Sequence, residues 1–186
     1  GFYGYAYQIY AMALMVSSLS LPTAVSKLVS AKMAVGQKRN AVRVFICSMV
    51  FGVAVGLVVT GVIFFGADTI AVYGMKSPLS VYALKMLAPG LFLVAVMAVI
   101  RGYFQGLGSM MPTAVSQIIE QIIRAVVSIV GASIFIDIGT RAGERSGEEL
   151  LGPAYGAAGA TLGTVLGALI AVIFLGFILF TFKGKM

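Results

Sequence analysis

Long apolar stretches without charge alternate along this chain with short stretches that are charged or rich in turn residues. No Asp, Glu, Lys or Arg occurs in residues 1–26, 44–67 or 150–182. A helix crosses the roughly 30 Å hydrocarbon core of a bilayer with about 20 residues, so each of these stretches is long enough for a transmembrane helix. Together with two further apolar segments they predict five spans, at about residues 2–32, 42–66, 79–103, 112–138 and 154–182.

The third predicted span must extend beyond its charge-free interval. Lys85 and Arg101 enclose only 15 residues, which reach about 22 Å as a helix and cannot cross the core. We expect the helix to begin near Leu79, with the Lys85 side chain reaching toward the interface. Pro89 then lies inside the helix and is expected to bend it.

Capping and turn residues predict where other helices begin and end. Asn40 is of the type that caps helix N-termini, which places the start of the second span just after it. Residues 137–153 combine acids, glycines and a proline, and we expect them to form a solvated loop between the last two spans.

Composition agrees with an all-α, polytopic transmembrane helical bundle. Hydrophobic residues make up 60% of the 186 residues and charged residues 10%, whereas soluble domains are about half apolar and a quarter charged. The sequence has no His and a single Cys. That excludes histidine-based nucleophile systems, His- or Cys-ligated zinc and internal disulfides. We therefore expect no enzyme, cofactor or metal site, and no nucleic-acid partner, because the net charge of +7 accompanies a mostly apolar chain.

Cations are distributed unequally between the two sides that five spans define. The segments between spans one and two and between spans three and four, with the C-terminus, hold eight cations and no acid. The opposite side holds four cations and five acids. Positive residues favour the cytoplasmic side, so we expect a multi-pass plasma-membrane protein with these two loops and the C-terminus in the cytoplasm. The eight cations are Lys27, Lys32, Lys38, Arg39, Arg43, Arg101, Lys183 and Lys185.

The fourth predicted span carries a polar stripe inside an apolar helix. A charge near the bilayer centre costs roughly 2.5 to 3.5 kcal/mol on insertion scales, so such charges face a bundle interior or a watery cavity. Two interpretations remain open. Glu120 and Arg124 could neutralise each other as a packing device, or the stripe could line a cavity that receives polar or anionic substrate groups. The stripe consists of Thr113, Gln117, Glu120, Gln121, Arg124 and Ser128.

Six residues are candidates for contact with a substrate. Two of them, Arg101 and Lys27, could equally be cytoplasmic topology anchors. The complete set is Arg124, Glu120, Gln117, Gln121, Arg101 and Lys27.

Glycines recur at four-residue spacing in two of the predicted spans. Small residues on one face let helix backbones approach closely inside a membrane. The spacing therefore predicts packing seams at Gly52 and Gly56 and at Gly159, Gly163 and Gly167.

Three segments resemble a known family of bacterial exporters. They read LPTAVSKLVSAK at residues 21–32, RGYFQGLGSMMPTAVSQIIEQIIR at 101–124 and AYGAAGATLGTVLGA at 154–168. This pattern is similar to the polysaccharide biosynthesis and stage V sporulation protein B group, whose superfamily includes lipid II flippases and multidrug efflux antiporters. The resemblance implies about fourteen helices in two lobes, of which this chain would supply helices two to six. It also implies a central cavity near Arg124, Glu120 and Gln117.

The resemblance implies a flippase that moves lipid-linked polysaccharide or peptidoglycan precursors outward by alternating access. The expected partners are an undecaprenyl-linked, pyrophosphate-bearing sugar, the lipid bilayer and the remaining helices of a longer parent chain. A second hypothesis is a cation-coupled multidrug antiporter in which Glu120 binds a proton or cation. A third is a non-transporting scaffold for cell-wall or spore-coat synthesis, because function resides in the site rather than in the fold.

Overall fold

The structure is a computed structural model that describes residues 20–69, 80–146 and 151–183. A helical segment at residues 20–34 is followed by α2 (Lys38–Thr69), α3 (Ser80–Gly106), α4 (Met111–Ser146) and α5 (Leu151–Lys183). The regular structure within these ranges is helical throughout, which confirms the predicted all-α class. The four labelled helices are long and apolar enough to cross a membrane. Much of the first predicted span, residues 2–32, lies outside the described residues.

Two predicted helix ends are wrong. The helix α2 begins before Asn40, because the carbonyl of Gln37 already accepts the backbone N–H groups of Asn40 and Ala41 at 3.0 and 3.1 Å. Asn40 is therefore inside the first turn and is not the cap. At the other end of the chain, α4 and α5 extend through most of the predicted loop 137–153 and leave only residues 147–150 between them.

The extended ends of α4 and α5 pack on each other, which explains why they stay helical. A Cβ atom at Gly139 of α4 would lie 2.7 Å from both the Leu151 carbonyl oxygen and the Tyr155 Cβ of α5. A Cβ atom at Gly152 of α5 would likewise lie 2.7 Å from the Thr140 Oγ1 of α4. Helices in a bundle are stabilised mainly by such tertiary packing. Here the packing of α4 on α5 outweighs the preference of these residues for loop conformations.

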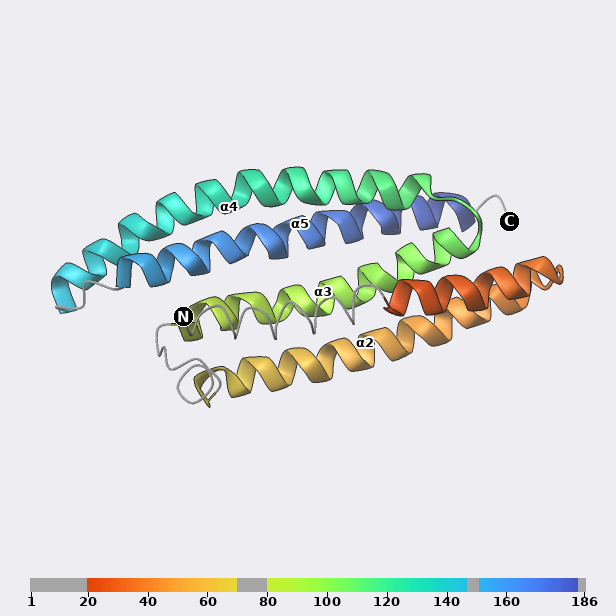
Figure 1. Cartoon of the computed structure of the whole chain (residues 1–186), viewed down its shortest axis with the longest axis horizontal. Coiled ribbons are helices and arrows are strands. Elements are labelled where there is room, and N and C mark those ends of the chain that lie inside the picture. Colours follow the sequence, from red (N-terminus) through yellow and green to blue (C-terminus); the bar gives the residue numbers. More distant parts are fainter. Residues whose placement is uncertain (1–19, 70–79, 147–150, 184–186) are drawn as a thin grey trace.

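Neighbouring helices form a row in the order α4, α5, α3, α2 (Figure 1). The helix α4 packs along α5, and α5 and α2 both pack on α3. The consecutive helices α3 and α4 touch little and diverge from their connection at residues 107–110. This connection, the turn at residues 35–37 and the end of α5 lie at one end of the molecule, as predicted. The orientation of that end relative to the membrane stays a prediction.

The glycine seams are confirmed. Gly52 and Gly56 of α2 face Val99, Ala95 and Phe92 of α3. In α5, the glycine seam meets the backbone of α4: Gly159 faces Gly131, Gly163 faces Ser128 and Gly167 faces the carbonyl of Glu120. The α4 backbone around Glu120 is thus fixed directly against α5.

The C-terminal part of α3 is held by apolar clusters on two sides. Val99 and Tyr103 pack with Val25 and Val29 of the segment 20–34, and with Ala41 of α2. Met97, Ile100 and Phe104 of α3 pack with Ala171 and Leu175 of α5. These two clusters fix the backbone on both sides of Arg101.

Candidate functional site

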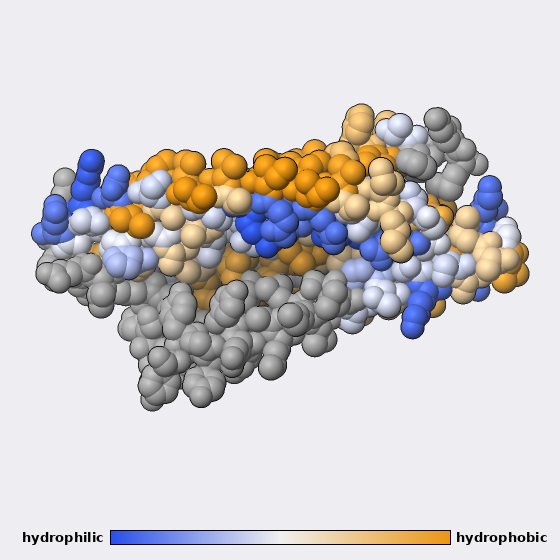
Figure 2. Space-filling model, turned by 45° about the horizontal axis from the view of Figure 1, so that its top comes forward, coloured by the Kyte–Doolittle hydropathy of each residue, from blue (hydrophilic) through white to orange (hydrophobic). Residues whose placement is uncertain are grey.

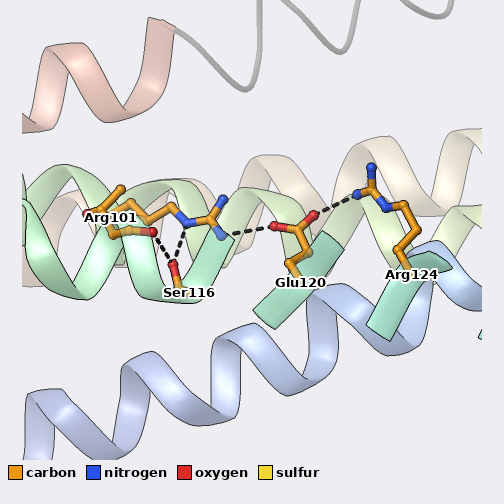
Figure 3. Close-up of polar contacts among 5 residues, drawn as sticks. Arg101, Ser116, Glu120 and Arg124 are labelled. Carbon is orange, nitrogen blue, oxygen red and sulfur yellow. Dashed lines mark hydrogen bonds and ion pairs between the residues drawn. The ribbon is translucent and has the colours of Figure 1, made fainter. Parts of the chain in front are cut away.

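A carboxylate from α4 is shared by two arginines from different helices. Glu120 Oε2 accepts a hydrogen bond from Arg101 Nη2 of α3 at 2.9 Å, and Oε1 accepts one from Arg124 Nη2 of α4 at 2.6 Å (Figure 3). The Glu120 side chain is 7% exposed, that of Arg101 12% and that of Arg124 35%. We call these three residues the ion cluster. The predicted pair of Glu120 and Arg124 is confirmed, and Arg101 joins it.

Ser116 fixes the position of Arg101. Its Oγ accepts a hydrogen bond from Arg101 Nε at 3.0 Å and donates one to the Thr113 carbonyl at 2.7 Å (Figure 3). Ser116 is fully buried. Sequence reasoning missed this residue because serine in an apolar helix is unremarkable, although its spacing of four from Glu120 placed it on the same helical face.

The ion cluster carries one positive charge in excess, because two guanidinium groups meet one carboxylate. Breaking a buried ion pair by removing one partner typically costs about 3 to 5 kcal/mol, since the other charge is left uncompensated. One arginine would be enough to neutralise Glu120. A packing device built from Glu120 and Arg124 alone therefore does not account for Arg101.

The structure divides the predicted polar stripe between two faces. Thr113 is buried, and Ser128 Oγ donates a hydrogen bond to the Ala160 carbonyl of α5 at 2.8 Å. Gln117 and Gln121 are exposed, and Arg124 lies between the two faces. The expectation that all six polar residues look onto one space is therefore wrong, because α5 covers the side that carries Ser128.

Arg101 and Lys27 have different surroundings. Arg101 lies inside α3, as the predicted span 79–103 required, but its side chain is largely buried in an ion pair and is not a free cytoplasmic cation. Without it the predicted cytoplasmic side holds seven cations, which still outnumber the four on the opposite side. Lys27 is exposed on the helical segment 20–34 and forms no ion pair with a described residue.

The exposed faces of α2 and α4 differ in polarity. Every exposed residue of α2 from 44 to 66 is apolar or is Cys47. The exposed face of α4 combines Gln117 and Gln121 with isoleucines such as Ile118 and Ile122. Figure 2, with the upper edge of the molecule turned forward, shows hydrophilic surface midway along the molecule beside a band of hydrophobic side chains. Polar side chains inside a span are unsuited to lipid contact, so the exposed face of α2 is suited to lipid, whereas the strip of α4 that carries Gln117 and Gln121 is suited to a polar environment.

The site offers hydrogen-bond donors and positive charge, and it has no metal-binding arrangement. Among residues 20–69, 80–146 and 151–183, no three His, Cys, Asp or Glu side chains come together. The available groups are guanidinium and amide N–H donors, which suit anions such as phosphate.

Comparison with known proteins finds a matching family and two relatives in Bacillus subtilis. The sequence profile of a family described as polysaccharide biosynthesis protein matches residues 1–185. Stage V sporulation protein B of Bacillus subtilis (strain 168) is 30% identical over 119 residues, covering 64% of this chain and 23% of that protein. The lipid II flippase MurJ of the same organism is 28% identical over 123 residues, covering 62% of this chain and 23% of that protein. The chain thus spans about a quarter of these relatives, and no solved structure matches it.

Proposed function

The chain belongs to the polysaccharide biosynthesis protein family, and from this premise we propose that it is part of a flippase for lipid-linked polysaccharide or peptidoglycan precursors. In this proposal the chain supplies about helices two to six, which form part of the N-terminal lobe of a two-lobed exporter in the cytoplasmic membrane. The turn at residues 35–37, the connection at residues 107–110 and the C-terminal end face the cytoplasm. The substrate is a pyrophosphate-bearing lipid-linked sugar.

The excess positive charge of the ion cluster is the observation that supports this proposal. The charge is held between α3 and α4 and extends to the exposed surface through the partly exposed side chain of Arg124. Gln117 and Gln121 are exposed on the same helix. A pyrophosphate group is anionic, and it would be stabilised by a guanidinium group in a medium of low dielectric constant. The lipid tail would stay in the bilayer, where apolar helix faces such as that of α2 are exposed.

The ion cluster is less suited to cation-coupled antiport. Both carboxylate oxygens of Glu120 already accept hydrogen bonds from arginines. A proton or metal cation would have to displace one of them. A non-transporting scaffold would not need the exposed glutamines in the N-terminal part of α4, since an amide group that loses its water contacts needs a polar environment.

The test is an export assay on the full-length protein that contains this chain. Arg124→Ala and Arg101→Ala are compared with Glu120→Gln and with Lys85→Ala, whose exposed side chain lies outside the ion cluster. Proteoliposomes would carry a fluorescent polyprenyl-pyrophosphate sugar, and its movement between leaflets would be followed. We expect a large loss in both arginine variants, a smaller loss in Glu120→Gln and normal movement in Lys85→Ala. Normal movement in both arginine variants would reject the proposal, and drug efflux abolished by Glu120→Gln would favour antiport.

A further inference from the structure

The two arginines of the ion cluster are held in different ways. Arg101 uses two of its three side-chain nitrogens, with Nε on Ser116 and Nη2 on Glu120. Its side chain is 12% exposed. Arg124 makes one hydrogen bond to the cluster, from Nη2 to Glu120, and its side chain is 35% exposed. The two guanidinium groups therefore differ in how many donors remain for another molecule.

Arg124 has unused donors. Its Nε is buried and has no hydrogen-bond partner among the residues that the structure describes. Its other terminal nitrogen points away from Glu120 (Figure 3). Buried donors in proteins are nearly always satisfied, so the unpaired Nε points to an acceptor outside the described residues. Guanidinium groups suit phosphate in particular, because two adjacent N–H groups match two phosphate oxygens.

Resting on the function proposed above, we infer that Arg124 binds the phosphate groups of the substrate, while Arg101 is a positioning residue. Arg101 already uses its Nε and one N–H of Nη2, and its side chain is only 12% exposed, so its remaining donors are poorly accessible to a ligand. Arg124 uses one N–H, and its side chain is 35% exposed, so it can bind a phosphate while Nη2 stays on Glu120.

The surroundings of Arg124 agree with this division of roles. Gln121 lies three residues before Arg124 and Gln117 seven before, so both glutamines lie on the side of the helix next to Arg124. Both glutamines are exposed and supply further amide donors. On the opposite side, Gly167 of α5 packs against the Glu120 carbonyl and the Arg124 backbone. The α4 backbone is thus fixed from behind, and Glu120, itself held by Arg101, fixes the guanidinium group.

Pyrophosphate binding to the purified full-length protein tests the inference. The probe is inorganic pyrophosphate, titrated by calorimetry into protein in detergent. We expect Arg124→Gln to weaken binding by at least roughly tenfold, the effect of losing one or more charged hydrogen bonds, and to leave the melting temperature nearly unchanged. Arg124→Lys keeps the charge and loses the paired donors, so we expect a smaller loss. Arg101→Gln should instead lower the melting temperature and weaken binding less than Arg124→Gln does.

A double substitution separates positioning from binding. Adding Glu120→Gln to Arg101→Gln removes the carboxylate that has lost its partner, and we expect the melting temperature to recover. Adding Glu120→Gln to Arg124→Gln should not restore pyrophosphate binding. Recovery of binding in that second pair would overturn the inference.

Two further results would also overturn it: a wild-type protein that does not bind pyrophosphate, or equal affinities in wild type and Arg124→Gln. The export assay keeps the two proposals apart. If the wild-type protein exports the lipid-linked sugar but Arg124→Gln binds pyrophosphate normally, this inference is rejected and the flippase stands. Arg124-dependent binding without any export supports the site and rejects the flippase.

Discussion

Arg101 and Glu120 join two consecutive helices that otherwise touch little. Their ion pair, 2.9 Å between Nη2 and Oε2, connects the C-terminal part of α3 to the N-terminal part of α4. The two helices diverge beyond this region (Figure 1). Because α3 is fixed by apolar clusters and α4 by the glycine seam of α5, the ion pair links two rigid parts. The strength of this ion pair therefore depends on the groups that orient the Arg101 and Glu120 side chains, such as Ser116.

Ser116→Ala is expected to destabilise the protein. The substitution removes the acceptor of Arg101 Nε, and an unsatisfied buried donor costs about 1 to 3 kcal/mol. The matched control is Ser133→Ala on the same helix, since Ser133 is exposed and donates only to carbonyls of its own helix. Thermal unfolding of the full-length protein in detergent measures both. Equal melting temperatures for the two variants would show that Ser116 does not support Arg101.

Gly102→Ala is expected to disrupt the contact between α3 and the helical segment 20–34. A Cβ atom there would lie 2.6 Å from the Pro22 carbonyl oxygen and 2.9 Å from its Cα. Backbone atoms cannot rotate away as a side chain does, and overpacking of this kind costs about 1 to 3 kcal/mol.

Gly61→Ala is the matched control for this prediction. Gly61 lies inside α2, and apart from its chain neighbours and its own helix backbone, no described residue places an atom within 4 Å of the position that a Cβ atom would take there. Replacing a helical glycine by alanine gains about 0.5 to 1 kcal/mol. We expect the melting temperature of Gly61→Ala to rise while that of Gly102→Ala falls. A Gly102→Ala protein as stable as wild type would contradict the close approach of Pro22.

Water should reach the exposed side of α4 that carries Gln117 and Gln121. It should not reach the exposed apolar side of α2. In a Cys47→Ser background, single cysteines at Gln117 and Gln121 are compared with cysteines at Val58 and Val62, which are exposed on α2. We expect a membrane-impermeant thiol reagent to label the first two in membranes and to leave the others unlabelled. If all four positions stay unlabelled, the polar face of α4 is dry and the transport pathway proposed for it fails.

Asp68→Asn is expected to have little effect on stability. Lys85 Nζ contacts Asp68 Oδ2 at 3.1 Å, but the two side chains are 39% and 67% exposed. Exposed ion pairs contribute little, because water screens them and ordering two flexible side chains opposes the gain. Glu120→Gln, made in a nearly buried carboxylate, should lower the melting temperature far more. Equal losses would mean that burial does not govern the strength of these ion pairs.

Sequence reasoning predicted the membrane helices well and some of their ends poorly. The absence of charge over more than 20 residues is a property of each segment alone, because the bilayer requires it whatever the neighbours are. Helix ends depend on neighbours. Residues 137–146 look like a loop by composition, yet they continue α4 because Gly139 and Gly152 allow α5 to pack there.

The ion cluster was predictable only in part. The pairing of Glu120 with Arg124 follows from their spacing of four on one helix. The polar stripe predicted that one side of this helix does not face lipid. The contact with Arg101 could not be deduced, because a cation near the cytoplasmic end of the predicted span 79–103 is equally suited to be a topology anchor. Its burial results from contacts with Ser116 and Glu120 of another helix, α4.

By itself the sequence determined that the chain forms apolar membrane helices with charge inside one of them, since the energetic penalty of charge in hydrocarbon acts on every segment separately. Only the tertiary structure decided that one carboxylate is shared by two arginines and that, of the three residues in the ion cluster, Arg124 is the one that reaches the surface. The reason is that the packing of α3, α4 and α5 sets which side chains meet, and no periodicity within one helix contains that information.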